Sequence, residues 1–211
     1  MLFRSYKSKT FTIMKKILKL SLVLATTVLS VVQAHAGNTD FSLDLKKEVG
    51  KTVSFSLKEI KKIDLSIYDT SDNLIYQENV ASDDNINRTY DLSAFPDGVY
   101  FLQAESDLKI SRYKIEVVGK TAKLSAEAVS EVYKPILVNR KGIVTLNLLN
   151  LNQVPVTVKI YSSNDTEVYN ETLPAELNVG KIFDVSKMQG DKCTFIITSA
   201  GKTFVETVIT K

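Results

Sequence analysis

The clearest pattern along the chain is an alternation of apolar and polar residues in short runs. Ile63, Leu65 and Ile67 alternate with Asp64, Ser66 and Tyr68, which is the period of a β-strand with one buried face. Clusters of Asp, Asn, Ser, Pro and Gly separate such runs, and these residues form turns. In the first half of the chain the pattern predicts strands near residues 41–46, 52–57, 63–69, 74–78, 86–91, 99–105 and 109–117. This number and spacing of strands are typical of an antiparallel β-sandwich of immunoglobulin-like type.

The second half of the chain repeats the first at an offset of 93 residues, which indicates a tandem duplication. The matching segments are Ile67-Tyr68 with Ile160-Tyr161, Ile75-Tyr76 with Val168-Tyr169, and Tyr90-Asp91-Leu92-Ser93 with Phe183-Asp184-Val185-Ser186. After one inserted residue the match is expected to resume at 94, so that Thr194 replaces Tyr100. We therefore predict an all-β protein with two tandem immunoglobulin-like antiparallel β-sandwich domains, at 37–119 and 131–211.

The segment between the two repeats has two interpretations. Leu124, Ala128 and Val132 lie at helical spacing and would share one face of a short helix. Alternatively, residues 120–130 are a linker that leads into the first strand of the second domain. We favour the linker, because the helix would be short and has no clear capping residue.

The first 36 residues are expected to be a secretory signal peptide that is removed on export. Lys15, Lys16 and Lys19 precede an apolar run at 20–32, and Ala34-His35-Ala36 has the small-x-small pattern of a cleavage site. The run is too short for a membrane-spanning helix, which needs about 20 apolar residues. Met14 is the expected true start, and cleavage is expected after Ala36.

Removal of the signal changes the charge and excludes several classes of chemistry. Six of the 27 basic residues and no acidic residue lie in 1–36, so 21 basic residues remain against 24 acidic ones, a net charge of −3. A nucleic-acid partner is therefore not expected, since it would need a basic surface. The only histidine, His35, also leaves with the signal, which removes histidine-based catalysis and imidazole metal sites. We expect no enzymatic activity, no cofactor, and no membrane insertion after cleavage.

The most distinctive motif is a corner between two predicted strands, at residues 91–102. Pro96 presets φ for a turn, and Gly98 tolerates a positive φ. Tyr100 then begins a strand, where its phenol can pack inward and bond to the backbone near the corner, as in the tyrosine corner of immunoglobulin-like sandwiches. The residues of this structural motif are Asp91, Pro96, Asp97, Gly98 and Tyr100.

The same region resembles a known family. Ile-Tyr-Asp at 67–69, Asn-Leu-Ile-Tyr at 73–76, Tyr-Asp-Leu-Ser at 90–93 and Pro-Asp-Gly-Val-Tyr-Phe-Leu at 96–102 resemble the C-terminal sorting domains of the type IX (Por) secretion system of Bacteroidetes. They also resemble related small secreted β-sandwich proteins. The resemblance covers 63–117 well and 156–211 weakly, and it implies a β-sandwich that targets a cargo through the outer membrane.

Three groups of side chains are weighed for a binding role. Acidic turns with Asp69, Asp72, Asn73, Asp83, Asp84 and Asn85 could offer oxygen ligands to calcium, but Asp and Asn are also ordinary turn formers. Tyr68 and Tyr161 lie on the outward phase of equivalent strands and form a possible interaction surface, although tyrosine also covers sheet surface for purely structural reasons. Cys193, the only cysteine, is expected to be a small buried residue.

These observations favour an exported, non-enzymatic protein-interaction or surface-associated module, located in the periplasm, on the cell surface or outside the cell. Its expected partner is an envelope or secreted protein of unknown identity, bound through a sheet edge or face. Two alternatives remain: a sorting or docking element for type IX secretion, and a module that binds glycans at the cell surface.

Overall fold

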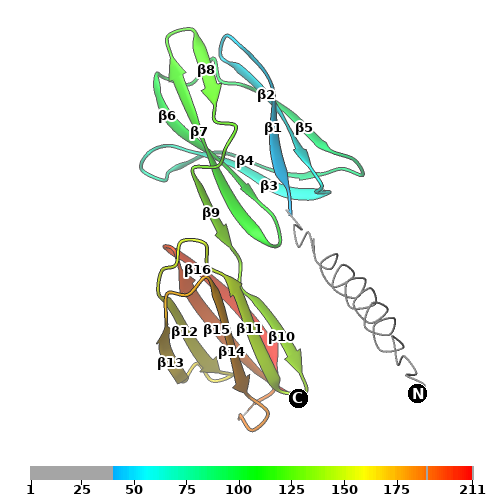
Figure 1. The fold of residues 1–211 in the computed structure, drawn as a ribbon, viewed down its shortest axis with the longest axis vertical. Coiled ribbons are helices and arrows are strands. Elements are labelled where there is room, and N and C mark those ends of the chain that lie inside the picture. The colour runs from blue at the N-terminus through cyan, green and yellow to red at the C-terminus, as the bar shows by residue number, and fades with distance from the viewer. Residues whose placement is uncertain (1–39, 189, 211) are drawn as a thin grey trace, which may run out of the picture. The chain divides into compact units, whose positions relative to one another are not determined.

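A computed structural model describes residues 40–188 and 190–210. The expected signal peptide at 1–36 lies outside these residues. All the regular elements of the described ranges are β-strands, which pair antiparallel in four sheets (Figure 1). None of the described residues forms a helix long and apolar enough to cross a membrane. The predicted all-β sandwich fold is confirmed.

The first sandwich consists of two facing sheets. The smaller has the order β1-β2-β5, and the larger has the order β4-β3-β6-β7-β8, with β9 also paired to β7. The strands are β1 (Ser42–Val49), β2 (Thr52–Lys58), β3 (Lys62–Tyr68), β4 (Leu74–Ala81), β5 (Ile86–Asp91), β6 (Gly98–Glu105), β7 (Lys109–Val118), β8 (Thr121–Leu124) and β9 (Ser130–Tyr133).

The second sandwich repeats this topology with fewer strands. One sheet has the order β10-β11-β14 and the other the order β13-β12-β15-β16. The strands are β10 (Ile136–Arg140), β11 (Ile143–Leu149), β12 (Val156–Ser162), β13 (Glu167–Leu173), β14 (Asn178–Asp184), β15 (Lys192–Ser199) and β16 (Lys202–Ile209). Strands β10–β16 therefore correspond in order to β1–β7, and the described part of the chain contains no counterpart of β8 or β9.

Strand registers show that the offset between the repeats stays at 93. Ile67 pairs with Leu102 just as Ile160 pairs with Phe195, and Tyr100 pairs with Ile115 just as Cys193 pairs with Val208. The expected change of offset to 94 is therefore wrong. Cys193, and not Thr194, occupies the position of Tyr100, and both residues are buried while Thr194 is on the partly exposed face.

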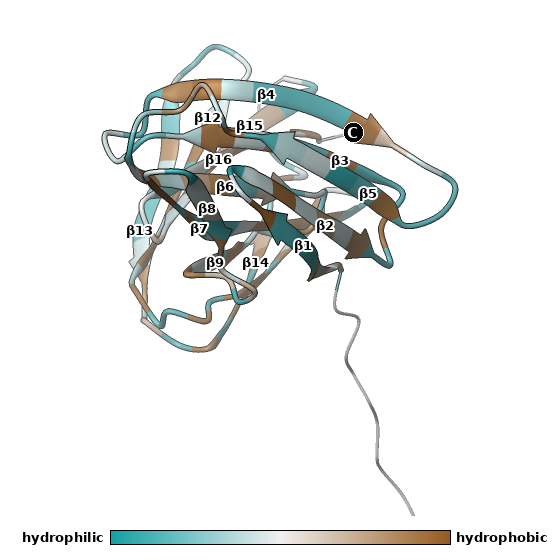
Figure 2. Cartoon of the chain, turned by 90° about the horizontal axis from the view of Figure 1, so that it is seen from above, coloured by the Kyte–Doolittle hydropathy of each residue, from teal (hydrophilic) through white to brown (hydrophobic). Residues whose placement is uncertain are grey.

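Each sandwich has a separate hydrophobic core built from the inward phase of its strands. Leu65, Leu102 and Ile115 are fully buried in the first, and Val158, Phe195 and Ile197 in the second. Figure 2 shows the hydrophobic and hydrophilic bands that this alternation leaves along the strands. Because the two clusters share no buried residue, each sandwich has the core it needs to fold as a unit of its own.

The segment at 120–133 differs from the expected linker and from the alternative helix. Its first part forms β8 and its last part forms β9, and both pair antiparallel with β7 of the first sandwich. The spacing of Leu124 and Val132 fits this arrangement because Ala122, Leu124 and Val132 are all buried by it. Of the three apolar residues that suggested one helical face, Leu124 and Val132 therefore belong to two short strands, and Ala128 lies between them.

Candidate functional site

The outer edge of β7 is covered along its whole length. Beyond β6, its neighbours are β8, which pairs with Ile115–Val118, and β9, which pairs with Lys109–Arg112. Ser125 fills the interval between these two strands: the Lys114 amide donates to Ser125 Oγ at 2.9 Å, and the Ser125 amide donates to the Lys114 carbonyl at 2.8 Å. No stretch of β7 is thus left as a free strand edge.

An ion pair between a buried lysine and a partly exposed glutamate joins β9 to β7. Lys109 Nζ lies 2.8 Å from Glu131 Oε1 on β9, and Ser111 Oγ donates to the same oxygen at 2.9 Å. The Lys109 side chain is only 5% exposed, and its ammonium lies 4.5 Å from the centroid of the Phe41 ring. Burial acts to raise the pKa of Glu131, but the hydrogen bonds from Lys109 and Ser111 outweigh it and lower that pKa from 4.5.

Strand β8 also closes one side of the first sandwich. The Ala122 amide donates to the Gly50 carbonyl at 2.8 Å, and the Leu124 amide donates to Glu48 Oε1 at 2.8 Å. Gly50 has a φ of +58° in the two-residue turn between β1 and β2, a conformation that favours glycine.

The corresponding strand of the second sandwich, β16, has a different edge. Within the described ranges it pairs with β15 alone, and its register with β15 has no bulge. Val205 and Ile209 are 60% and 66% exposed, and β16 contains no proline. Asn139 Nδ2 donates to the Ile209 carbonyl at the last residue of the strand. Sheet edges are usually protected by proline, bulges, charged side chains or covering segments. Strand β16 carries the charged Lys202 and Glu206 but has no proline, bulge or covering strand within the described residues, so its main-chain edge is open for most of its length.

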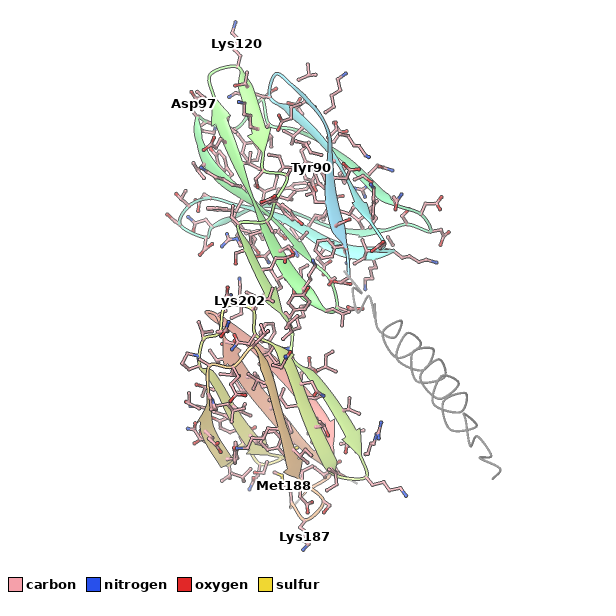
Figure 3. All side chains as sticks on the ribbon, in the orientation of Figure 1. Tyr90, Asp97, Lys120, Lys187, Met188 and Lys202 are labelled. Atoms are coloured by element: carbon pink, nitrogen blue, oxygen red, sulfur yellow. The ribbon has the colours of Figure 1, made fainter. Side chains whose placement is uncertain are left out.

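The opposite side of each sandwich is closed by a duplicated ion pair between β4 and β5, or β13 and β14. Arg88 Nε lies 3.1 Å from Glu78, and Lys181 Nζ lies 2.6 Å from Glu171. A tyrosine hydroxyl donates to each carboxylate, from Tyr90 at 2.7 Å in the first sandwich and from Tyr169 in the second. Tyr90, labelled in Figure 3, is 9% exposed, and burial followed by the Glu78 hydrogen bond raises its pKa.

Four of the five corner residues take part in hydrogen bonds, whereas Gly98 does not adopt the positive φ that its place in the turn suggested. Tyr100 donates its hydroxyl to the Pro96 carbonyl at 3.0 Å and packs edge-to-face on Phe95 at 5.0 Å between centroids. Asp97 accepts the Gly119 amide at 2.8 Å, and Asp91 accepts the Ser93 amide at 2.9 Å. The Asp91 bond recurs in the second sandwich, where Asp184 accepts the Ser186 amide at 3.0 Å.

The two tyrosines expected at an interaction surface are both half-buried and engaged within their own sandwich. The Arg112 guanidinium lies 5.4 Å from the centroid of the Tyr68 ring, and Tyr161 donates its hydroxyl to Glu167 at 2.9 Å. The Glu167 hydrogen bond raises the pKa of Tyr161. Tyr68 lies on β3 of the first sandwich and Tyr161 on β12 of the second.

The acidic turn at 69–73 uses its carboxylate oxygens on the protein itself. Asp69 accepts the amides of Ser71 and Asn73 at 2.8 and 2.9 Å, and hydrogen bonds from Asn73 lower its pKa. Asp72 pairs with Arg112 at 2.7 Å. In the described part of the chain, no three His, Cys, Asp or Glu side chains are grouped to hold a metal ion. Cys193 is fully buried, and burial raises the pKa of its thiol.

Comparison with known families finds a match to most of the first sandwich. Residues 49–118 match the secretion system C-terminal sorting domain. The match runs from the end of β1 to the end of β7, so the sorting-domain region stops before β8 and β9. The resemblance inferred from residues 63–117 is confirmed, and a sorting domain of this family implies export to the cell surface or the extracellular space.

Structural comparisons give weaker likenesses. The BSP domain of a biofilm-associated protein is 14% identical, with a TM-score of 0.28, and aligns with 78% of this chain and 29% of that one. Escherichia coli α2-macroglobulin spanning domains NIE–MG1 is 11% identical, with a TM-score of 0.26 over 81% and 98%. The human OSCAR ligand-binding domain is 11% identical, with a TM-score of 0.23 over 80% and 97%. No curated protein matches the chain.

Residues at the two equivalent edges were not singled out from the sequence. Lys109 on β7 pairs with Glu131 on the covering strand β9, while Lys202, Val205 and Glu206 lie on the open β16. The 93-residue offset places Lys202 at the position of Lys109. Because residues 120–130 were expected to be a linker, the strands that cover the edge of β7 were not predicted, and the difference between the two edges could not be seen.

The ion pair between Lys109 and Glu131 predicts that the stability of the first sandwich depends on pH. Because the pKa of Glu131 is lowered on folding, its contribution is present above about pH 4.5 and is lost as the pH falls through the folded pKa. Glu131→Gln, which leaves the buried Lys109 without its counter-charge, should cost about 1–3 kcal/mol at pH 7. Below pH 4 the difference in free energy of unfolding between the variant and the wild type should become smaller. Denaturant unfolding at pH 7 and below pH 4 measures this difference, with the exposed Glu127→Gln as control. An equal loss of stability at the two pH values would contradict the stabilising role given to the Glu131 carboxylate.

Proposed function

We propose that this exported β-sandwich protein is a protein-interaction module whose second sandwich binds an extended strand of a partner along β16. The observation that carries the proposal is the difference between two equivalent strands of one chain. Strand β7 is covered by β8 and β9, whereas β16 ends its sheet within the described residues. The duplicated fold thus contains its own example of an edge that takes an added strand.

Strand addition suits the chemistry of this edge. Unpaired amides and carbonyls along β16 can form main-chain hydrogen bonds with an extended peptide, and alternate side chains can set its register. Val205 and Ile209 project on the outward phase, and Val208 on the buried phase. Sorting domains and immunoglobulin-like folds are typically non-catalytic, which agrees with a binding role.

A peptide that copies β9 tests this function directly. We expect a peptide of residues 128–135 to bind the full mature chain, because its strand covers the equivalent edge of β7. Val205→Lys should weaken binding at least about tenfold, since a lysine on an edge opposes strand pairing. Titration of a labelled peptide by fluorescence anisotropy measures the affinity, with a scrambled peptide as control. Equal affinity for wild type and Val205→Lys, or no binding to either, would contradict the proposal.

The family match favours a second candidate function, a docking element for type IX secretion. We infer that the first sandwich carries it, because residues 49–118 lie entirely within this sandwich. The second sandwich would then travel with it as the binding part.

Reporter fusions in a host with type IX secretion separate the two sandwiches. A periplasmic reporter joined ahead of residues 37–211 should reach the cell surface or medium, and residues 37–135, which contain the first core and β1–β9, should suffice. Residues 134–211 should leave the reporter in the periplasm. Surface delivery by the second sandwich alone would show that the docking role does not belong to the first sandwich. Periplasmic retention of every fusion would reject a docking role for either sandwich.

A further inference from the structure

We infer that the strand accepted by β16 is β16 of a second copy of this chain, antiparallel to the first and related to it by a two-fold axis at Val205. This inference rests on the proposed function, since it names the partner of the same edge. Its basis is the pairing of β9 with β7, which can be transferred to β16 residue by residue at the 93-residue offset.

The transfer fixes the register. On β7, Lys109 pairs with Tyr133, Ile110 with Val132, Ser111 with Glu131 and Arg112 with Ser130. Lys109–Arg112 correspond to Lys202–Val205, because the β6–β7 and β15–β16 registers coincide. An incoming strand in the place of β9 must therefore put its first residue opposite Val205 and its fourth opposite Lys202.

Strand β16 itself supplies a sequence that fits these places. In this register, four residues of the second copy take the positions of the four residues of β9. Ser130-Glu131-Val132-Tyr133 are replaced, in this order, by Val205-Glu206-Thr207-Val208. The glutamate falls at the same place in both strands. Glu206 of the second copy then lies diagonal to Lys202, as Glu131 lies diagonal to Lys109 with a 2.8 Å contact between their charged atoms.

The register is also self-complementary, as a two-fold interface requires. Val205 lies opposite Val205 of the second copy, which covers a side chain that is 60% exposed in the single chain. Thr203 lies opposite Thr207 on both sides of the axis, and threonine pairs are favourable across strands. The symmetry makes two Lys202–Glu206 pairs, so every charge in this segment has an opposite partner.

Two-fold registers on the C-terminal side of Val205 lack this match. An axis at Glu206 would put two glutamates directly opposite each other, which is destabilising. An axis at Thr207 would place Glu206 opposite Val208 and move Lys202 beyond Ile209, the last residue of the partner strand. An axis at Phe204 would place Lys202 directly opposite Glu206, so charge complementarity is met at Phe204 and at Val205. The register of β9 on β7, transferred to β16, selects the axis at Val205.

A charge exchange tests the inference in the full mature chain. Wild type should be a dimer by light scattering coupled to size exclusion. Lys202→Glu and Glu206→Lys should each weaken the dimer about tenfold, because each loses two ion pairs and gains two like-charge contacts.

Mixing the two variants provides the decisive arm of this test. In a dimer of one copy of each, the glutamate introduced at position 202 faces the lysine introduced at position 206, and the native Lys202 of one copy faces the native Glu206 of the other. An equimolar mixture should therefore restore a dimer of wild-type affinity. A mixture no tighter than the separate variants would overturn the inference.

Cysteine substitution gives an independent measure of the register. Val205→Cys should form an intermolecular disulfide under mild oxidation, because directly opposed residues of antiparallel strands have Cβ atoms close enough to bridge. Thr207→Cys is the matched control on the same face, and it should cross-link only when mixed with Thr203→Cys. The native Cys193 is fully buried and does not compete. Efficient cross-linking of Thr207→Cys alone would reject the register.

The results separate this inference from the proposed function. A wild type that stays monomeric up to millimolar concentration but binds the β9 peptide would overturn the homodimer and leave the strand-binding function intact. Loss of both dimer and peptide binding would overturn both.

Discussion

The main constraint on this molecule is that the backbone amides and carbonyls at a sheet edge need hydrogen-bond partners. In the first sandwich this need is met within the chain, by β8, by β9 and by Ser125 between them. The ion pair between the buried Lys109 and Glu131 holds β9 in place. The second sandwich has the same strands up to β16, and within the described residues no further strand pairs with the outer edge of β16. The proposed function follows from that difference.

Duplication explains why two similar sandwiches can have different roles. The Glu78–Arg88 and Glu171–Lys181 pairs close the same side of both, and Asp91 and Asp184 form the same turn. The tyrosine corner exists in the first only, because Cys193 replaces Tyr100. The family match covers only the first sandwich, which is consistent with export functions residing there and binding residing in the second.

Much of the fold could be predicted from the alternation of residues such as Ile63, Leu65 and Ile67, because a period of two depends only on which face is buried. The position of Cys193 could not, since the corner residues around it differ from those near Tyr100 and a one-residue gap seemed to restore the match. Strands β8 and β9 were missed because four-residue strands carry too little pattern to be distinguished from a helix or a linker. The open edge was missed for the same reason: its importance appears only when β7 is seen to be covered.

Amide hydrogen exchange resolved to single residues tests the central claim most directly. In dilute solution, all amides of β7 should exchange slowly, whereas alternate amides of β16, those that point away from β15, should exchange fast. At high concentration these β16 amides should become slow as the second copy pairs with them. Slow exchange along all of β16 at every dilution would mean that its edge is already covered within the chain, and would contradict the account.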